Sequence, residues 1–512
     1  MKIIARLDAN STIGAGHLIR VLTLLNQLVK QSDYYPSDVL IISYSLSDSF
    51  KNLITHHGFR YHMINQVNNW SMDYDAQTTA ELIGDDSIAD LVIVDHYELD
   101  KRWEQKLTTY CHQLIVIDDL ANREHHCNTL IDQTLGRKKD DYSDLVPPYC
   151  KLLLGATYII LRPEFQPLRI TAKQTRSNNI KNILIAFGAT DPQDNSSKVV
   201  AWLAQFLKTN PQINFHCTIM ITSASPHLNN IKQICKMSPW LSYTIDEKNV
   251  AELLLKTDLA IGASGSASWE RCCLGIPTIA FQTADNQKMV LAELDKAGAI
   301  ANLKKLTEQS QDEFNQCLSR LIDDTNYYTN MRRNSFKICD GTGTSLICDH
   351  LLSNTLALRL ATKKDENLLY RWQSNPHIRQ FFRNPNAVTF NEHATWFRNS
   401  LKLSSRTIYI IELGSNSNAL PVGTLRFDKV NSQQYEVSIL IDHNFQNQKL
   451  GWRALKSTPK KFRSKEIIAS VHIDNKASQQ LFLSAGYSQI TNNSFLLKSE
   501  NKSCLLRSSH YE

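Results

Sequence analysis

Short runs of consecutive apolar residues alternate with segments of helical periodicity along the first part of the chain. Such runs lie at Ile3–Leu7, Asp38–Leu46, Ala89–Tyr97 and Gln113–Leu120, and they are typical of parallel strands buried on both faces. A segment of helical length separates each run from the next, which is the βαβ pattern of a doubly wound sheet.

The same alternation begins again after a polar stretch, Ile170–Asn179. Its strand-like runs end on small or polar residues, so two Rossmann-like halves with a linker near residue 172 are predicted. We expect a cleft between them, because ligands bind at the carboxyl ends of parallel strands. The predicted fold class is α/β, with two Rossmann-like domains.

From Leu356 the pattern changes, and four strand-like runs follow one another closely: TIYIIEL, PVGTLRFD, YEVSILID and EIIASVHID. Close spacing of this kind indicates a mixed α+β domain rather than a third doubly wound sheet. The predicted domains are 1–171, 172–352 and 355–500.

The chain has 512 residues, of which 42% are hydrophobic and 21% charged. The length calls for roughly three domains. The composition is that of an ordinary folded protein and excludes disorder. Because no apolar stretch approaches 18 residues and no signal pattern opens the chain, we expect a cytoplasmic protein without a membrane partner. Eleven cysteines occur without a CxxC pair, which favours a reducing compartment and predicts no metal site.

The net charge of +6 is unevenly distributed, since residues 355–512 carry 22 basic and 11 acidic residues. Such a region fits nucleic acid, a small polyanion such as coenzyme A, or a solvated surface. Nucleic acid is the weakest of the three interpretations, because the basic residues lack the interleaved aromatic residues of a single-strand binder.

The segment Ile261–Pro277 would turn from a strand into a helix at Ser264, Gly265 and Ser266. The free N–H groups of such a turn, with the positive end of the helix, suit a diphosphate. Glu270 follows one helical turn later and could take both hydroxyls of a ribose. Taken alone, such a segment is more often a tight strand–helix turn with an N-cap serine, because Gly/Ser turns are common.

Two further loops at predicted strand ends have residues suited to a ligand. Small residues in FGATDPQ, from Phe187 to Gln193, let the backbone approach a ligand at Gly188, and ADNQ provides the amides of Asn286 and Gln287. Three such loops in one half predict a nucleotide site.

His17 stands at the start of a predicted helix, behind the glycine-containing stretch STIGAG. A helix N-terminus lowers the pKa of a nearby imidazole, which keeps it neutral and able to accept a proton. A histidine in such a turn is more often a capping residue. Opposite a sugar nucleotide it becomes a candidate general base for attack on the anomeric carbon.

The stretches RLDANSTIGAGHLIRVLTL, IVDHYELDKRWE, FGATDPQ and GASGSASWERCCLGIP together resemble the UDP-2,4-diacetamido-2,4,6-trideoxy-β-L-altropyranose hydrolases of pseudaminic acid biosynthesis, over residues 1–350. The resemblance implies a GT-B fold of two Rossmann-like domains and a metal-independent, cofactor-free, inverting hydrolase with His17 as its catalytic base. Ala189 departs from the family pattern and fits there unless the position needs a positive φ. The implied substrate-binding residues are Asp8, Gly14, Gly16, Arg20, Tyr97, Gly188, Ser264, Gly265, Ser266, Glu270, Asn286 and Gln287.

The last third resembles a GNAT acetyltransferase in LRLATKKDENLLYRWQSNP, PVGTLRF and NKASQQLFLSAGY. Related enzymes acetylate the 4-amino group of the same sugar nucleotide, so acetyl-CoA is the implied co-substrate. Lys449 replaces a loop glycine, Pro459 interrupts the following helix, and Phe482 stands where many relatives have a general-acid tyrosine. The implied acetyl-CoA-binding residues are Gln446, Lys449, Gly451 and Asn475.

These observations predict a UDP-sugar hydrolase fused to the N-acetyltransferase of the preceding step. One alternative keeps the GT-B fold but passes the sugar to an acceptor, as a glycosyltransferase. In the other, the C-terminal domain only binds acetyl-CoA or a partner and does not catalyse a reaction.

Overall fold

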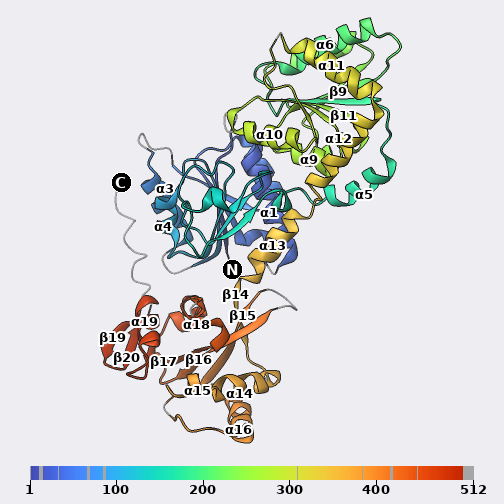
Figure 1. The fold of residues 1–512 in the computed structure, drawn as a ribbon. Helices are drawn as coiled ribbons and strands as arrows, with labels where there is room; N and C mark the ends of the chain where they lie inside the picture. The colour runs from blue at the N-terminus through green and yellow to red at the C-terminus, as the bar shows by residue number, and fades with distance from the viewer. Residues whose placement is uncertain are drawn as a thin grey trace, which may run out of the picture. The chain divides into compact units, whose positions relative to one another are not determined.

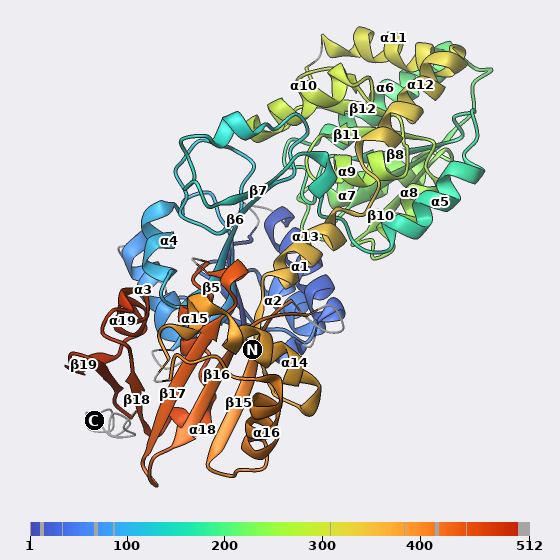
Figure 2. The ribbon, with the colours of Figure 1, turned by 60° about the horizontal axis from the view of Figure 1, so that its bottom comes forward.

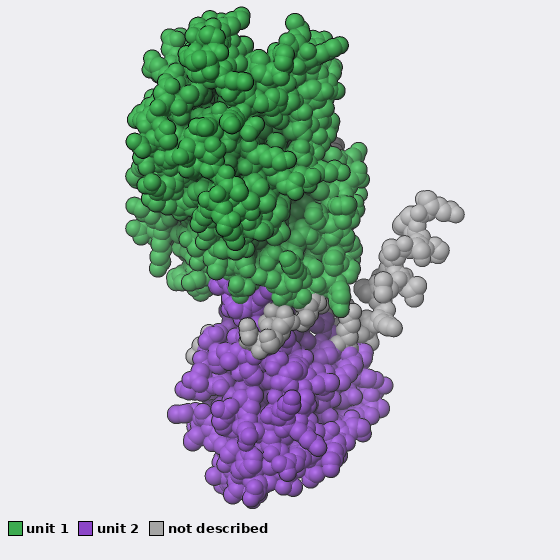
Figure 3. All heavy atoms as spheres, turned by 90° about the vertical axis from the view of Figure 1, so that its right-hand side faces the viewer, with its two compact units in different colours: residues 1–82, 91–349 green, residues 83–90, 350–512 purple. Residues whose placement is uncertain are grey.

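The computed structural model describes residues 2–10, 15–32, 34–65, 70–84, 88–307, 309–382, 384–414, 419–446 and 448–499, without the side chains of Asn286 and Lys460. The chain divides into two compact units, Met1–Leu82 with Leu91–Asp349 and Ile83–Asp90 with His350–Glu512 (Figure 3). Each unit has hydrophobic clusters of its own. Among the described residues, no helix is both long and apolar enough to cross a bilayer.

The first sheet has seven strands in the order β3-β2-β1-β4-β5-β6-β7, and β1 pairs in parallel with both β2 and β4. Figure 1 shows helices α1, α3 and α4 beside this sheet. Every residue of β1 is buried, as its continuous apolar run predicts. The strand order reverses between β1 and β4, the place where doubly wound sheets bind ligands. Its strands are β1 Ile3–Leu7, β2 Val39–Ser43, β3 Arg60–Met63, β4 Ala89–Asp95, β5 Cys111–Ile117, β6 Thr129–Asp132 and β7 Lys151–Leu154, and its helices are α1 Gly16–Gln31, α2 Asp48–His56, α3 Met72–Ile83 and α4 Lys101–Leu107.

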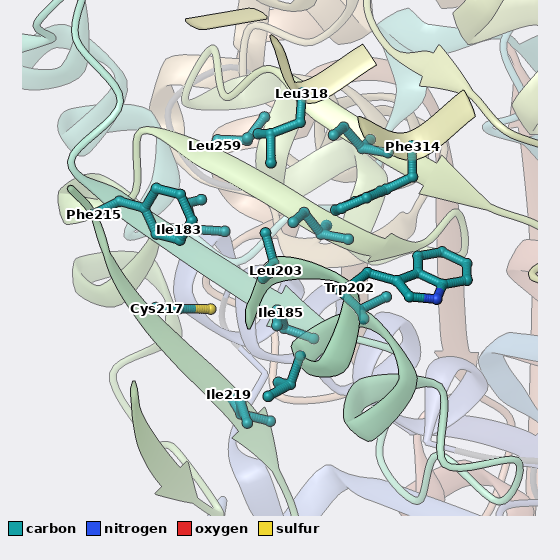
Figure 4. Packing of buried hydrophobic residues seen from close by; sticks show 14 of the residues in the cluster. Ile183, Ile185, Trp202, Leu203, Phe215, Cys217, Ile219, Leu259, Phe314 and Leu318 are labelled. Atoms are coloured by element: carbon teal, nitrogen blue, oxygen red, sulfur yellow. The ribbon is translucent and has the colours of Figure 1, made fainter. Parts of the chain in front are cut away.

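The second sheet is also parallel, with six strands in the order β10-β9-β8-β11-β12-β13. Figure 4 shows side chains from β8, α6 and α11 gathered in its core, among them Ile185, Trp202 and Phe314. Gly262 in β11 is required, because a Cβ there would lie 1.9 Å from the Ala186 carbonyl oxygen of β8. The strands are β8 Asn182–Ala186, β9 His216–Ile221, β10 Leu241–Ile245, β11 Leu259–Ala263, β12 Thr278–Phe281 and β13 Ala301–Asn302; the helices are α5 Phe165–Thr175, α6 Asn195–Thr209, α7 Leu228–Met237, α8 Val250–Lys256, α9 Ala267–Cys273, α10 Lys288–Lys296, α11 Ser310–Asp323, α12 Thr325–Ile338 and α13 Gly343–Ser353.

The third sheet is mixed, with seven strands in the order β14-β15-β16-β17-β18-β20-β19. Only β17 and β18 pair in parallel, and Figure 2 shows β15, β16 and β17 side by side. The strands are β14 Leu356–Leu360, β15 Arg406–Leu413, β16 Leu420–Lys429, β17 Gln434–Ile441, β18 Glu466–Ser470, β19 Ser488–Thr491 and β20 Ser494–Leu497; the helices are α14 Glu366–Ser374, α15 Pro376–Arg379, α16 Phe390–Ser400, α17 Leu450–Lys456, α18 Lys460–Arg463 and α19 Lys476–Ser484. The predicted fold class, two Rossmann-like domains and an α+β domain, is confirmed.

Candidate functional site

His17 lies at the N-terminus of α1, as predicted, since the helix begins at Gly16. Its Nδ1 is 2.5 Å from Oδ1 of Asp95, the last residue of β4, and Arg20 donates from Nε and Nη2 to the same carboxylate at 2.5 and 2.6 Å. The His17 side chain is only 6% exposed. A carboxylate at Nδ1 holds the proton there, which leaves Nε2 of a neutral imidazole free to accept one.

A second carboxylate, Asp119, follows β5 and joins this cluster. Arg20 donates from Nη1 to its Oδ2 at 3.0 Å, and the Tyr97 hydroxyl donates to the same oxygen at 3.4 Å. The Tyr97 ring meets the His17 ring edge-on, with centroids 4.7 Å apart. In the described part of the chain, Oδ1 of Asp119 is buried and has no hydrogen-bond partner. The structure thus brings His17, Arg20 and Tyr97 together.

Asp8 belongs to a separate network at the end of β1. Its carboxylate accepts hydrogen bonds from Arg6 at 2.7 Å, His96 at 2.9 Å, and the Ser43 hydroxyl and Tyr44 N–H at 2.8 Å each. Burial raises the pKa of Asp8, but the hydrogen bond from His96 and the charge of Arg6 outweigh burial and hold the pKa far below its usual range. In this arrangement Asp8 ties the ends of β1, β2 and β4 together, and its predicted contact with substrate stays a prediction.

The turn from β11 into α9 has the predicted strand–turn–helix geometry. Ser264 is fully buried, and its hydroxyl has no partner among the described residues, while Ser266 is the exposed N-cap of α9. A Cβ on Gly265 would lie 3.8 Å from Nε2 of Gln287, so two of the predicted loops meet here. The Oε1 atom of Gln287 accepts a hydrogen bond from the Thr283 N–H at 3.0 Å, which fixes the orientation of the amide.

Glu270 on α9 has a partner that the sequence did not indicate. Arg162 donates from Nη2 to its Oε1 at 3.1 Å. Burial raises the pKa of Glu270, and the positive charge of Arg162 opposes this rise. A ribose bound to Glu270 would therefore share the carboxylate with Arg162.

The remaining residues predicted to bind substrate have simpler surroundings. Gly188 is exposed after β8 with φ +94°, which favours glycine, whereas Ala189 has no positive φ, so alanine fits there. Gly16 is exposed, and a Cβ on it would meet nothing within 4 Å. Gly14 lies outside the described residues, as does the side chain of Asn286.

A pocket of about 910 Å³ opens in the second unit. The pocket opens where strands β17 and β18 separate. These strands pair only from Gln434–Glu466 to Glu436–Ile468. Residues Val437 to Ile441 of β17 line the opening. All four residues predicted to bind acetyl-CoA line the same pocket, namely Gln446, Lys449, Gly451 and Asn475.

The three departures from the GNAT pattern have different consequences. Lys449 is left-handed, with φ +58°, a conformation that costs a non-glycine residue about 1–2 kcal/mol. Pro459 is the N-cap of α18 and lies between two helices, so the expected break is present without the penalty of a proline inside a helix. Phe482 is buried against Tyr487 and Phe495 and lines the pocket.

No group of three or more potential metal ligands occurs within the described ranges. Two potential metal ligands of the stretch His125–Cys127 contact other residues: Nδ1 of His125 is 2.7 Å from Oε1 of Glu104, and the sulfur of Cys127 is 3.6 Å from that of Cys150. Nε2 of His125 is buried without a hydrogen-bond partner among the described residues, 3.9 Å from Oδ2 of Asp118.

Asp95, Asp119 and Arg162 were not among the residues predicted from the sequence. Both aspartates close an apolar run at the end of a strand, and parallel strands end at the same edge of a sheet. That shared edge was the available signal for Asp95 and Asp119. Arg162 carries no comparable local signal.

Both parts of the chain are similar to known proteins. Residues 355–488 match the family model of the acetyltransferase (GNAT) domain, which implies an acyl-CoA co-substrate. Over 300 residues the chain is 26% identical to the UDP-2,4-diacetamido-2,4,6-trideoxy-beta-L-altropyranose hydrolase of Campylobacter jejuni, covering 58% of this chain and 97% of that protein. Over 456 residues it is 25% identical to an uncharacterised protein of Methanocaldococcus jannaschii, covering 87% of each.

Among solved structures, the crystal structure of MurG from Acinetobacter baumannii aligns with 69% of this chain and 99% of its own, at 13% identity and a TM-score of 0.47. The match to the family model shows that the C-terminal part of the chain is a GNAT acetyltransferase domain. The part before it is distantly related to a nucleotide-sugar hydrolase.

Proposed function

We propose that the first unit hydrolyses a UDP-linked diacetamido-trideoxyhexose, and that the GNAT domain acetylates the amino sugar in the preceding step. The observation that carries the proposal is the buried His17–Asp95–Arg20 cluster at the N-terminus of α1. The 26% identity to the Campylobacter jejuni hydrolase supports the choice of substrate class.

In the proposed reaction, water attacks C1 of the sugar while Nε2 of His17 takes the proton of that water. The bond between C1 and the diphosphate oxygen breaks, and its electron pair leaves with UDP. Asp95 holds the proton of His17 on Nδ1 and stabilises the imidazolium that forms, in the way carboxylates act on histidine bases.

The leaving group would bind at the turn Ser264–Ser266. Backbone N–H groups at the start of α9 and the buried Ser264 hydroxyl, which lacks a protein partner, suit diphosphate oxygens. Glu270 would accept hydrogen bonds from the ribose hydroxyls, and Gln287 lies next to Gly265 for a further contact.

The test is an NMR assay of two reactions catalysed by the full chain. One contains the diacetamido UDP-sugar alone, and the other contains the 4-amino UDP-sugar with acetyl-CoA. We expect free diacetamido sugar from both, reduced by about 10²–10⁴-fold in His17→Ala because the general base is lost.

His216→Ala is the matched control, since His216 is an exposed histidine on β9 that contacts Ser242. The control should retain the wild-type rate. Sugar released only from the pre-acetylated substrate would contradict the acetyltransferase role alone. UDP release that requires a sugar acceptor would replace the hydrolase with a glycosyltransferase.

A further inference from the structure

One histidine in the GNAT pocket has no partner for either ring nitrogen. His393, near the start of α16, is 4% exposed and lines the pocket. In the part of the chain that the structure describes, neither Nδ1 nor Nε2 makes a hydrogen bond. Buried polar atoms are usually paired, and an unpaired one costs free energy, so each exception calls for an explanation.

The walls around His393 are aromatic. Tyr370 of α14 and Trp396 of α16 each lie with ring centroids 5.5 Å from the imidazole, and Phe397 stacks on it at 6.2 Å and 13°. None of these contacts satisfies a ring nitrogen, so both nitrogens are available to a group that enters the pocket.

The charged groups closest to His393 in these elements are already paired. Glu366 of α14 accepts from Arg398 at 2.7 and 2.8 Å, and Arg379 of α15 donates to the carbonyl oxygen of Gln373 at 3.2 Å. Burial lowers the pKa of His393, with Glu366 opposing the shift and Arg379 adding to it. The lowered pKa favours the neutral imidazole, which is able to accept a proton.

The carboxylates that line the pocket are less suited to accept a proton. Glu436 accepts a hydrogen bond from the Ser470 hydroxyl at 2.8 Å, and Glu392 accepts two from Thr389 at 2.8 and 2.7 Å in a capping box. Arg426, which also lines the pocket, forms an ion pair with Asp428 at 2.8 Å and donates from Nη2 to the Ser438 hydroxyl at 3.3 Å. His393 differs from these three residues, because neither of its ring nitrogens makes a hydrogen bond or an ion pair among the described residues.

We propose that His393 accepts the proton that a primary ammonium must lose before it attacks acetyl-CoA in this pocket. The inference rests on the proposed acetyltransferase role and adds the residue that makes the amine reactive. The proton passes from nitrogen to the imidazole, directly or through one water molecule.

The steps that follow need no other residue of the pocket. The amine lone pair forms the bond to the thioester carbonyl carbon, and the carbon–sulfur bond breaks with its electron pair on sulfur. The second proton of the nitrogen goes to the thiolate to give coenzyme A, and His393 returns its proton to solvent. No tyrosine acid is needed, in agreement with phenylalanine at position 482.

The test measures thiol release from acetyl-CoA with the 4-amino UDP-sugar as acceptor, between pH 5.5 and 9.5, for wild type, His393→Gln and His216→Gln. His216 is an exposed histidine on β9 of the first unit that contacts Ser242, so it is the control. We expect kcat/KM of His393→Gln to fall about 100-fold at pH 7. The deficit should shrink as pH rises, because the free amine then forms without a base, while acetyl-CoA affinity and the control stay unchanged.

A wild-type pH profile in His393→Gln would overturn the role of His393 alone. A wild-type protein that binds acetyl-CoA but releases no thiol would overturn the acetyltransferase role, and this proposal with it. If His393→Gln unfolds, ring ¹³C signals of histidine in the wild-type protein give the answer. The His393 signal should move when the acceptor binds, and an unmoved signal would overturn the proposal.

Discussion

Buried histidines in the two units of this protein have opposite surroundings. In the first unit, His17 lies against Asp95, and His125 lies between Glu104 at 2.7 Å and Asp118 at 3.9 Å. In the second unit, His393 contacts the rings of Tyr370, Trp396 and Phe397, and neither of its ring nitrogens has a hydrogen-bond partner among the described residues. The partners of a buried histidine, rather than burial itself, therefore decide what the histidine does.

The pKa values make this contrast concrete. Burial lowers the pKa of His125, but the interactions with Asp118 and Glu104 outweigh burial and raise the pKa to about 9. For His393 burial prevails and the pKa is lowered. The surroundings of His125 thus favour the charged imidazole, and those of His393 favour the neutral form, which can accept a proton.

The largest expected effect comes from removing the carboxylate that distinguishes His17. In Asp95→Asn the amide N–H₂ faces Nδ1, which shifts the proton of His17 to Nε2 and leaves no proton acceptor. We expect kcat for sugar release to fall about 10²–10⁴-fold with little change in KM. Steady-state kinetics with the diacetamido UDP-sugar measure this.

Asp75→Asn controls for the loss of a buried carboxylate. Asp75 is fully buried and accepts from Arg6 at 2.6 Å and from Trp103 at 2.8 Å. Both variants should lose about 3–5 kcal/mol of stability, the usual cost of breaking a buried ion pair. Equal losses of kcat in both would mean that Asp95 acts only through stability.

The next effect concerns pH and the charge on His125. Its folded pKa of about 9 lies above the unfolded value of 6.5, so its contribution is fully present below pH 6.5 and is lost as pH rises through 9. We expect the free energy of unfolding to drop by about 2–3 kcal/mol over this window. Denaturant unfolding at pH 6, 7, 8 and 9 measures it.

In His125→Gln this drop should be absent, whereas in His393→Gln it should remain, because the pKa of His393 is shifted the other way. If the free energy of unfolding dropped equally over this pH window in wild type, His125→Gln and His393→Gln, His125 would not be held as a cation.

The smallest effect is at Lys449, in the loop that lines the GNAT pocket. Lys449→Gly removes the penalty of a left-handed lysine, less the entropy that glycine loses on folding, so stability should rise by about 0.5–1 kcal/mol. The neighbouring Gln448→Gly has no such strain to relieve and should lower stability. Thermal unfolding of both variants measures the difference, and a loss in Lys449→Gly would contradict it.

Local patterns were enough to predict the strands and the position of His17. The continuous apolar runs became β1, β4 and β5, and the turn before the first long helix placed His17 at its N-terminus. The partners of His17 were not predictable in this way, because Asp95 and Asp119 reach it only through the order of strands in the sheet. Lys449 stands between these cases: its departure was visible in the sequence, but its left-handed backbone was not.

The early separation of β17 from β18 gives the third sheet an edge in its interior. Backbone groups along Val437 to Ile441 face this opening on the side away from β16. An edge of this kind can take up an extended ligand as if it were another strand. Until one binds, the unpaired edge is also a place where a second polypeptide could add by mistake, so occupancy of the pocket would guard the protein against aggregation.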